Sequence, residues 1–257
     1  MISITLPDGS IRAFAPGTTP MEVAKNISEG FARNVISASF EGTTIETSTP
    51  LTTDGSLILY TWNDAEGKKA FWHSTSHVMA QVLEEMFPGI QLTLGPAIAN
   101  GFYYDVDFGD QKITEADFKA IESRILEISK EKHEFKMRAV TKAEALETYK
   151  DNVYKTELIS NLEDGTITFC DHATFTDLCR GGHIPNTSII KAVKIMSVAG
   201  AYWRGDEKNK QLTRVYGTSF PKQKDLTEYL ELLEEAKRRD HRKLGKELEL
   251  FAFSQKV

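Results

Sequence analysis

The chain has 257 residues, of which 31 are basic and 37 acidic, so its formal net charge at pH 7 is −6. That length allows one large or two smaller domains. The acidic balance excludes a general attraction to nucleic acid, so any such binding needs a local basic patch. No apolar run approaches the roughly 18 residues that a membrane span needs, and the N-terminus shows no secretory signal pattern. With only two cysteines, a disulfide framework is not expected, and a reducing, cytoplasmic compartment fits best.

The first 62 residues are predicted to form a small domain of their own. Thr19, Pro20 and Glu22 form a capping box with proline at the first helical position, which predicts a short helix over residues 20–27. Strands are expected at residues 2–6, 11–14, 35–40, 45–47 and 57–61. This order of strands and helix describes a β-grasp arrangement. An accessory domain without chemistry and a binding role are both compatible with it.

The next segment carries two histidines. A polar stretch at 63–69 has the composition of a linker and places a domain boundary there, and residues 68–86 predict a helix that ends before Pro88. His73 and His77 lie four positions apart, so they share one face of this helix. Apolar residues occupy the opposite face, so the histidines are expected off the buried stripe and are poor candidates for core residues.

The remainder mixes strands and helices, and the whole chain is predicted to be α+β, with a final linker helix. The last helix, residues 222–246, ends in a basic run that includes Lys237, Arg238 and Arg239. A solvated charged face is the default interpretation of such a run, and a phosphate-backbone contact is the alternative. Strands are expected at residues 102–107, 135–140, 166–170, 192–198, 202–203 and 211–220, and further helices from residues 114, 141 and 155.

Cys179 and His183 bring a thiol and a third imidazole together in a loop that contains glycines. If this loop packs over the first helix of the second domain, these two side chains converge with His73 and His77. Three imidazoles and a thiolate match tetrahedral zinc ligation. They equally suit a metal-free pocket in which one histidine activates water and the others orient a substrate. The spacing leaves both alternatives open.

Five segments carry a resemblance to a known family: residues 73–80 (HSTSHVMA), 101–107 (GFYYDVD), 177–183 (DLCRGGH), 200–206 (GAYWRGD) and 239–248 (RDHRKLGKEL). In these segments the chain resembles the N-terminal half of bacterial threonyl-tRNA synthetases. The resemblance implies three parts. Residues 1–62 resemble the TGS domain, residues 63–224 the editing domain shared with alanyl-tRNA editing proteins, and residues 225–257 the linker helix and the start of the aminoacylation domain.

The resemblance implies an editing hydrolase for serine wrongly esterified to tRNA(Thr). A binding pocket discriminates a single missing methyl group by only roughly 10–200-fold, a range known from aminoacyl-tRNA synthetases, so a second hydrolytic pocket is needed. Two other functions stay open. One is a module that binds the tRNA acceptor arm with little activity of its own. The other is a zinc-dependent hydrolase of another ester or amide that uses the same side chains.

Site roles follow from the same resemblance. His73 is expected to activate or position water, with His77, Cys179 and His183 around it. Asp177 is expected to bind the seryl ammonium group or to hold the loop. Lys155 would stabilise the oxyanion, with a surface lysine as the alternative. Tyr104 would line the serine pocket, with a core strand residue as the alternative. Lys237, Arg238 and Arg239 would contact tRNA.

No metal is expected for editing, with zinc at His73, His77, Cys179 and His183 as the alternative. ATP, magnesium and the zinc of the catalytic core belong to the aminoacylation domain, which is expected beyond Val257, so this chain alone is not expected to charge tRNA. The expected partners are tRNA(Thr) and its seryl-adenosine end, with no membrane contact. The full-length protein is expected to be a homodimer and this fragment a monomer. Gly182 stands where many family members carry proline, which is expected to loosen the loop.

Overall fold

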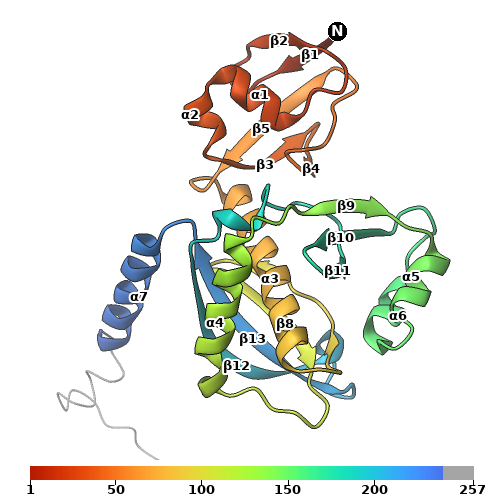
Figure 1. Cartoon of the computed structure of the whole chain (residues 1–257), viewed down its shortest axis with the longest axis vertical. Coiled ribbons are helices and arrows are strands. Elements are labelled where there is room, and N and C mark those ends of the chain that lie inside the picture. The colour runs from red at the N-terminus through yellow and green to blue at the C-terminus, as the bar shows by residue number, and fades with distance from the viewer. Residues whose placement is uncertain (240–257) are drawn as a thin grey trace, which may run out of the picture.

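The computed structural model describes residues 1–239. The chain forms three layers of structure along its length, with a small N-terminal unit stacked on a larger α+β body (Figure 1). This confirms the predicted α+β class. The parts of the predicted basic helix and of the fifth family segment that follow Arg239 lie outside the described residues.

The N-terminal unit is a five-stranded mixed sheet of order β2-β1-β5-β3-β4, crossed by one main helix. Only β1 and β5 run parallel, and the other neighbours are antiparallel. This is the expected β-grasp arrangement, with its own apolar core around Ile4, Val23 and Leu57. Its elements are β1 (Ile2–Thr5), β2 (Ile11–Phe14), α1 (Pro20–Ile27), α2 (Glu29–Ala32), β3 (Val35–Phe40), β4 (Thr43–Ile45) and β5 (Gly55–Thr61).

Helix α1 has the predicted bounds, because its start is specified locally. The Thr19 hydroxyl accepts a hydrogen bond from the Glu22 N–H (3.3 Å), and the Glu22 carboxylate accepts one from the Thr19 N–H (2.8 Å). The strand predicted at 45–47 is wrong by two residues, since β4 ends at Ile45. The single-turn helix α2 was missed because four residues carry no helical period.

The histidine-bearing helix α3 (Ala65–Met86) begins four residues after β5 ends. The linker predicted at 63–69 is therefore wrong from Ala65 onward, where the polar residues form the first turns of the helix. Gly67 allows this close junction, because a Cβ built there would lie 2.0 Å from the carbonyl oxygen of Thr61. Trp62 packs edge-on against Phe71 and so joins the two units.

The larger body is built on an antiparallel sheet of order β12-β13-β8-β6, with β7 also paired to β8. Helices α3 and α4 lie together against this sheet (Figure 1), and their apolar sides form the largest core with it. The two strands predicted at 192–198 and 202–203 are one strand, because pairing with β13 continues through Gly200. The elements are β6 (Gln91–Leu92), β7 (Ala97–Ile98), β8 (Gly101–Asp107), α4 (Glu115–Lys130), β12 (Ala192–Tyr202) and β13 (Gln211–Phe220), with 3-10 turns at Thr187–Ile189 and Trp203–Gly205.

A third layer carries the cysteine loop. It is a small antiparallel sheet of order β11-β10-β9 with two short helices beside it, and it has a separate core around Ile159 and Phe169. Strand β11 was not predicted, yet it leads directly into Cys179. The elements are β9 (Lys136–Ala139), α5 (Lys142–Thr148), α6 (Val153–Ser160), β10 (Thr168–His172) and β11 (Phe175–Leu178).

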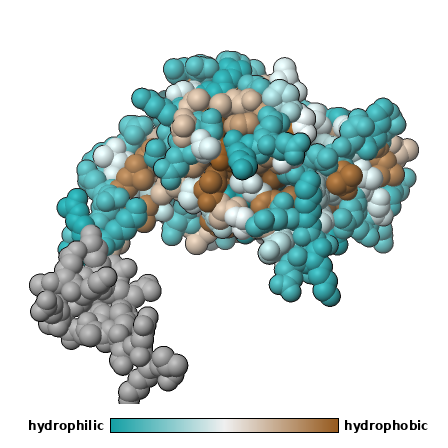
Figure 2. Space-filling view, turned by 90° about the horizontal axis from the view of Figure 1, so that it is seen from below, coloured by the Kyte–Doolittle hydropathy of each residue, from teal (hydrophilic) through white to brown (hydrophobic). Residues whose placement is uncertain are grey.

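Helix α7 (Gln223–Arg238) follows β13 and lies on the side of the body away from β9–β11 (Figure 1). Leu226 is its one buried residue, packed near Phe220. The face of the molecule shown in Figure 2 is mainly hydrophilic, with hydrophobic side chains gathered near its middle. Among residues 1–239, no helix combines the length and the apolar character that crossing a membrane requires.

Candidate functional site

Four side chains from α3 and the loop after β11 form one compact cluster. The structure brings together His73, His77, Cys179 and His183, with one donor atom of each lying within 4.8 Å of all the others. His73 Nε2 lies 3.1 Å from Cys179 Sγ and 3.3 Å from His77 Nε2. Cys179 Sγ lies 3.4 Å from His183 Nε2. Residues more than 100 positions apart in the chain thus converge on one point.

The two histidines of α3 are not on an open face of the helix. His77 is 3% exposed and His73 is half-buried, so the expectation that both lie off the buried surface is wrong for His77. The reason is that the cysteine loop covers this side of α3 while the central sheet covers the other. His73 keeps an edge toward open space, and its Nδ1–H faces the carbonyl oxygen of Gly95 at 3.4 Å.

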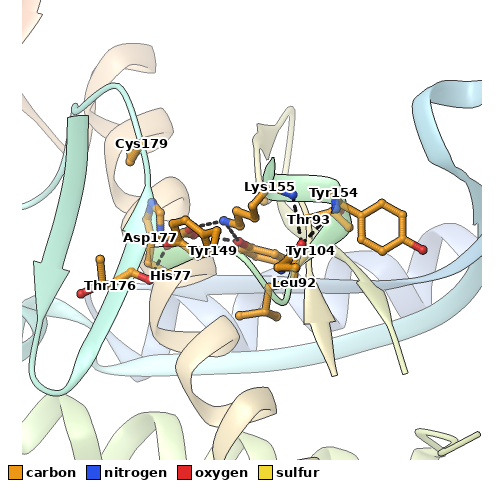
Figure 3. A network of polar contacts seen from close by, with 12 residues as sticks. His77, Leu92, Thr93, Tyr104, Tyr149, Tyr154, Lys155, Thr176, Asp177 and Cys179 are labelled. Atoms are coloured by element: carbon orange, nitrogen blue, oxygen red, sulfur yellow. Dashed lines mark hydrogen bonds and ion pairs between the residues drawn. The ribbon is translucent and has the colours of Figure 1, made fainter. Parts of the chain in front are cut away.

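Asp177 is the centre of a buried polar network behind the cluster (Figure 3). Its Oδ2 accepts a hydrogen bond from the Tyr104 hydroxyl (2.7 Å) and lies 2.9 Å from His77 Nδ1. Its Oδ1 forms an ion pair with the Lys155 ammonium group, which also donates to the Tyr104 hydroxyl (3.3 Å). Both carboxylate oxygens are therefore already used by the protein. This favours the loop-holding role for Asp177 over capture of an ammonium group.

Lys155 and Tyr104 also lie deeper than their predicted roles require. Lys155 is 2% exposed and Tyr104 is 1% exposed, so Lys155 is not the surface lysine of the alternative interpretation. Neither side chain lines the large cavity beside the cluster, whose wall includes His73 and Cys179. Lys155 instead borders a smaller cavity of about 280 Å³ on the far side of Asp177. Both side chains contact Asp177 and not the large cavity.

The large cavity has a volume of about 970 Å³ and opens beside the cluster. Tyr103 lines it while Tyr104 does not, because successive residues of β8 face opposite sides of the sheet. Arg214 forms a bidentate ion pair with Asp105 (2.7 and 2.8 Å), and its guanidinium lies 3.8 Å from the centre of the Tyr103 ring. None of these three residues was predicted as a site residue from the sequence. Their one distinctive feature is the Arg214 guanidinium over the Tyr103 ring. This contact forms only because β8 pairs with β13, so the sequence around either residue does not reveal it.

The cluster holds opposite charges in balance. Burial raises the pKa of the Cys179 thiol, but the charge of His77 and contacts with His183 and His73 outweigh it, so that pKa lies well below its ordinary value. Burial lowers the pKa of His183, yet its contacts with Cys170, Cys179 and a glutamate raise it well above the usual value. Burial lowers the pKa of His73, so its ring is neutral at pH 7. A neutral imidazole therefore lies beside a thiolate–imidazolium pair.

A glutamate from the N-terminal unit reaches the same cluster. Glu46, which follows β4, accepts a hydrogen bond from the Gly182 N–H (2.9 Å) and lies 3.0 Å from His183 Nδ1. Nothing in the local sequence around Glu46 marks it as a site residue. It was missed because its partners are 136 and 137 positions away.

The two units of the chain match two known domain families. Residues 2–61 match the TGS domain, and residues 167–216 match the threonyl and alanyl tRNA synthetase second additional domain. Over all 257 residues the chain is 91% identical to a threonine–tRNA ligase of Flavobacterium johnsoniae and 86% identical to one of Flavobacterium psychrophilum. It is 57% identical to a threonine–tRNA ligase of Cytophaga hutchinsonii over 259 aligned positions.

The chain belongs to the threonine–tRNA ligase family. Each of these matches covers 100% of this chain and 40% of the relative, so the chain spans about 40% of the length of the curated relatives it matches. It corresponds to their N-terminal part. The match to the second additional domain contains β11 and Cys179, and therefore includes half of the His/Cys cluster.

In this threonine–tRNA ligase region the cluster has the residue types and the close spacing of a zinc site. Tetrahedral Zn²⁺ with bonds of about 2.0–2.1 Å to nitrogen and 2.3 Å to sulfur sets its ligand atoms about 3.3–3.6 Å apart. Three of the six separations, at 3.1–3.4 Å, are close to those values, and all four ligand atoms lie within 4.8 Å of one another. Carboxylates at the far nitrogens of His77 and His183, from Asp177 and Glu46, are also typical of zinc-bound histidines. The four side chains therefore fit the metal.

The three basic residues of α7 are not part of this cluster. Lys237, Arg238 and Arg239 lie at the end of a helix on the other side of the body (Figure 1). Lys237 and Arg239 pair with Glu234 and Glu235 of the same helix. These pairs fit the default interpretation of a solvated face and reduce the positive charge offered to a phosphate.

Proposed function

We propose that this region of a threonine–tRNA ligase hydrolyses the ester of mischarged Ser-tRNA(Thr). The observation that carries the proposal is the cluster of three imidazoles and a thiol, of which His73, His77 and Cys179 line a cavity of about 970 Å³. A cavity of this size suits an aminoacylated adenosine, since ligand pockets range over about 300–1,000 Å³. The family of the chain makes tRNA the natural partner. The two free, buried cysteines suit a cytoplasmic location.

His73 is the residue best placed to activate water. Its Nδ1–H is directed to the Gly95 carbonyl, which leaves a lone pair on Nε2. Nε2 lies 3.1 Å from Cys179 Sγ and 3.3 Å from His77 Nε2, so a water must displace these contacts before it can give up its proton there. Water would lose a proton to His73 Nε2 as its oxygen attacks the ester carbonyl. The imidazolium would return that proton to the departing ribose oxygen, which leaves free serine and uncharged tRNA. The positive charge of His183 and His77 would stabilise the negative charge that develops on the carbonyl oxygen.

The test is release of serine from Ser-tRNA(Thr), measured beside release of threonine from Thr-tRNA(Thr). His73→Ala is expected to lower the rate of serine release by roughly 100-fold or more, the usual contribution of a general base. His133→Ala is the matched control, because His133 is partly exposed and pairs with Glu131 away from the cluster. Serine release that persists in His73→Ala would exclude this role. No release by the wild-type chain would leave a tRNA-binding module.

Zinc-dependent hydrolysis is the second candidate, and the ligand separations favour it. Zn²⁺ would be held by His73, His77, Cys179 and His183, and it would polarise the ester carbonyl or acidify water only if one of these ligands gave way or a fifth position opened. Elemental analysis of the purified chain decides between the alternatives. One equivalent of zinc that disappears in Cys179→Ser, with activity lost on chelation, supports the zinc enzyme. Full activity without zinc supports the metal-free site.

We also propose that Lys237, Arg238 and Arg239 contact the phosphate backbone of tRNA. Replacing all three with alanine is expected to weaken tRNA binding. The slope of the logarithm of the binding constant against the logarithm of salt concentration should become shallower by the equivalent of up to about three phosphate contacts. Lys224→Ala, at the start of the same helix and likewise paired with a glutamate, is the control. An unchanged salt dependence would leave the run as a solvated face.

A further inference from the structure

The N-terminal TGS unit contributes a buried carboxylate to the cluster of the other unit. Glu46 is 9% exposed, and its two oxygens face the loop that carries Cys179 and His183. Oε1 accepts from the Gly182 N–H (2.9 Å), and Oε2 accepts from the His183 N–H (3.1 Å). Oε1 also lies 3.0 Å from His183 Nδ1. Three donors of one loop thus converge on one side chain of another domain.

The backbone of the loop is shaped to receive this carboxylate. Gly181 and Gly182 have φ angles of +95° and +90°, in a region that residues with a side chain rarely adopt. Consecutive N–H groups in such a turn point to one side and form a concave anion site. Proline at position 182 could not adopt this φ, and it has no N–H to donate this hydrogen bond. Gly182 therefore does not loosen the loop here; Glu46 holds it in place.

The contact also fixes the hydrogen on the ring of His183. An ionised carboxylate only accepts hydrogen bonds, so Nδ1 of His183 must carry a hydrogen toward Glu46. Nε2, on the opposite side of the ring, then faces Cys179 Sγ at 3.4 Å. The other buried histidine of the cluster has the same arrangement, since His77 Nδ1 lies 2.9 Å from Asp177. The difference is that Asp177 belongs to the same unit as the cluster and Glu46 does not.

We propose that Glu46 is a positioning residue of the hydrolytic site, through which the TGS unit orients His183 and the Cys179 loop. The site is complete only when the two units are docked as they are in this structure. The orientation of the His183 ring rests on contacts alone, and its effect on hydrolysis rests on the proposed function. Nδ1 of His183 faces Glu46 and Nε2 faces the cluster, so the same contact would serve a metal-free or a zinc-bound cluster.

The experiment uses the whole chain with Glu46→Ala and Glu46→Gln, and with Glu66→Gln as a control on the exposed first turn of α3. Ring-nitrogen NMR of His183 reports whether Nδ1 carries a hydrogen in a fixed environment. Wild type and Glu66→Gln are expected to show this signal, and Glu46→Ala is expected to lose or shift it. Glu46→Gln keeps the shape of the side chain, so it should fold normally and retain the Nδ1 signal at a shifted position.

Kinetics of serine release supply the second measurement. Glu46→Ala is expected to lower kcat by about 10-fold or more while KM changes less than twofold, and Glu46→Gln is expected to recover part of kcat. If Glu46→Ala does not fold, the comparison of Glu46→Gln with Glu66→Gln decides. A His183 spectrum and a kcat equal to wild type in the Glu46 variants would overturn the inference. If the wild type releases no serine, the proposed function fails, and the NMR comparison still decides whether Glu46 orients His183.

Discussion

The buried pair of Lys155 and Asp177 should dominate the stability of the site. Asp177→Asn removes the charge that neutralises an ammonium group that is 2% exposed. Removing one partner of such a pair costs about 3–5 kcal/mol, because the other charge stays buried and uncompensated. Asparagine can still accept the hydrogen bond of Tyr104, so the loss comes from the charge. We expect the free energy of unfolding to fall by about 3–5 kcal/mol, measured by urea unfolding with circular dichroism.

A double-mutant cycle isolates the pair from the rest of the network. Lys155→Met combined with Asp177→Asn removes both charges of this pair, so the double variant should be less destabilised than the sum of the single changes by about 2–3 kcal/mol. The control cycle is Lys150 with Glu147, whose side chains are 60% and 74% exposed; it should give a coupling of only about 0.2–0.5 kcal/mol. A cost below about 1 kcal/mol for Asp177→Asn, with a coupling no larger than the control, would refute the reasoning.

Two further changes test other parts of the interior. Burial lowers the pKa of His172 to about 3, and its ring nitrogens are among the unpartnered buried atoms of the described chain. The unfolded chain therefore binds a proton at this imidazole more readily than the folded chain does. Stability is lost as the pH falls below 6.5, by about 2 kcal/mol at pH 5. Unfolding of His172→Phe should lack this part of the slope between pH 7 and 5, and an unchanged slope would contradict the assignment. Gly67→Ala should destabilise the chain by about 1–3 kcal/mol because the added Cβ meets the Thr61 carbonyl, whereas Gly30→Ala, with 4.0 Å of space, should be neutral or slightly stabilising in thermal unfolding.

The elements that were predicted correctly are those whose start or spacing is specified by residues next to one another in the sequence. Helix α1 was predicted at its bounds because Thr19, Pro20 and Glu22 specify its start within four residues. The spacing of His73 and His77 likewise predicted a shared helix face. The strand over 192–202 was divided because Ala-Gly-Ala at 199–201 has no strand character of its own, and its pairing partner β13 supplies it.

The burial of the site residues could not be predicted in the same way. His77, Lys155 and Tyr104 are buried because a second layer closes over α3, and their partners come from distant segments. Which of Tyr103 and Tyr104 faces the cavity is equally invisible in the sequence, since both belong to one strand. Glu46 has no local signal, and only the docking of the two units reveals it.

The alternation along β8 limits how the length of this chain can change. Tyr103 and Asp105 face the cavity, while Tyr104 faces the buried network. A single residue inserted within 101–107 would exchange these two sets, placing the cavity side chains in the interior. The exposed turn at 206–209, between β12 and β13, carries no such constraint. Insertions and deletions among relatives should therefore collect in that turn and be absent from β8, which an alignment of the family can check directly.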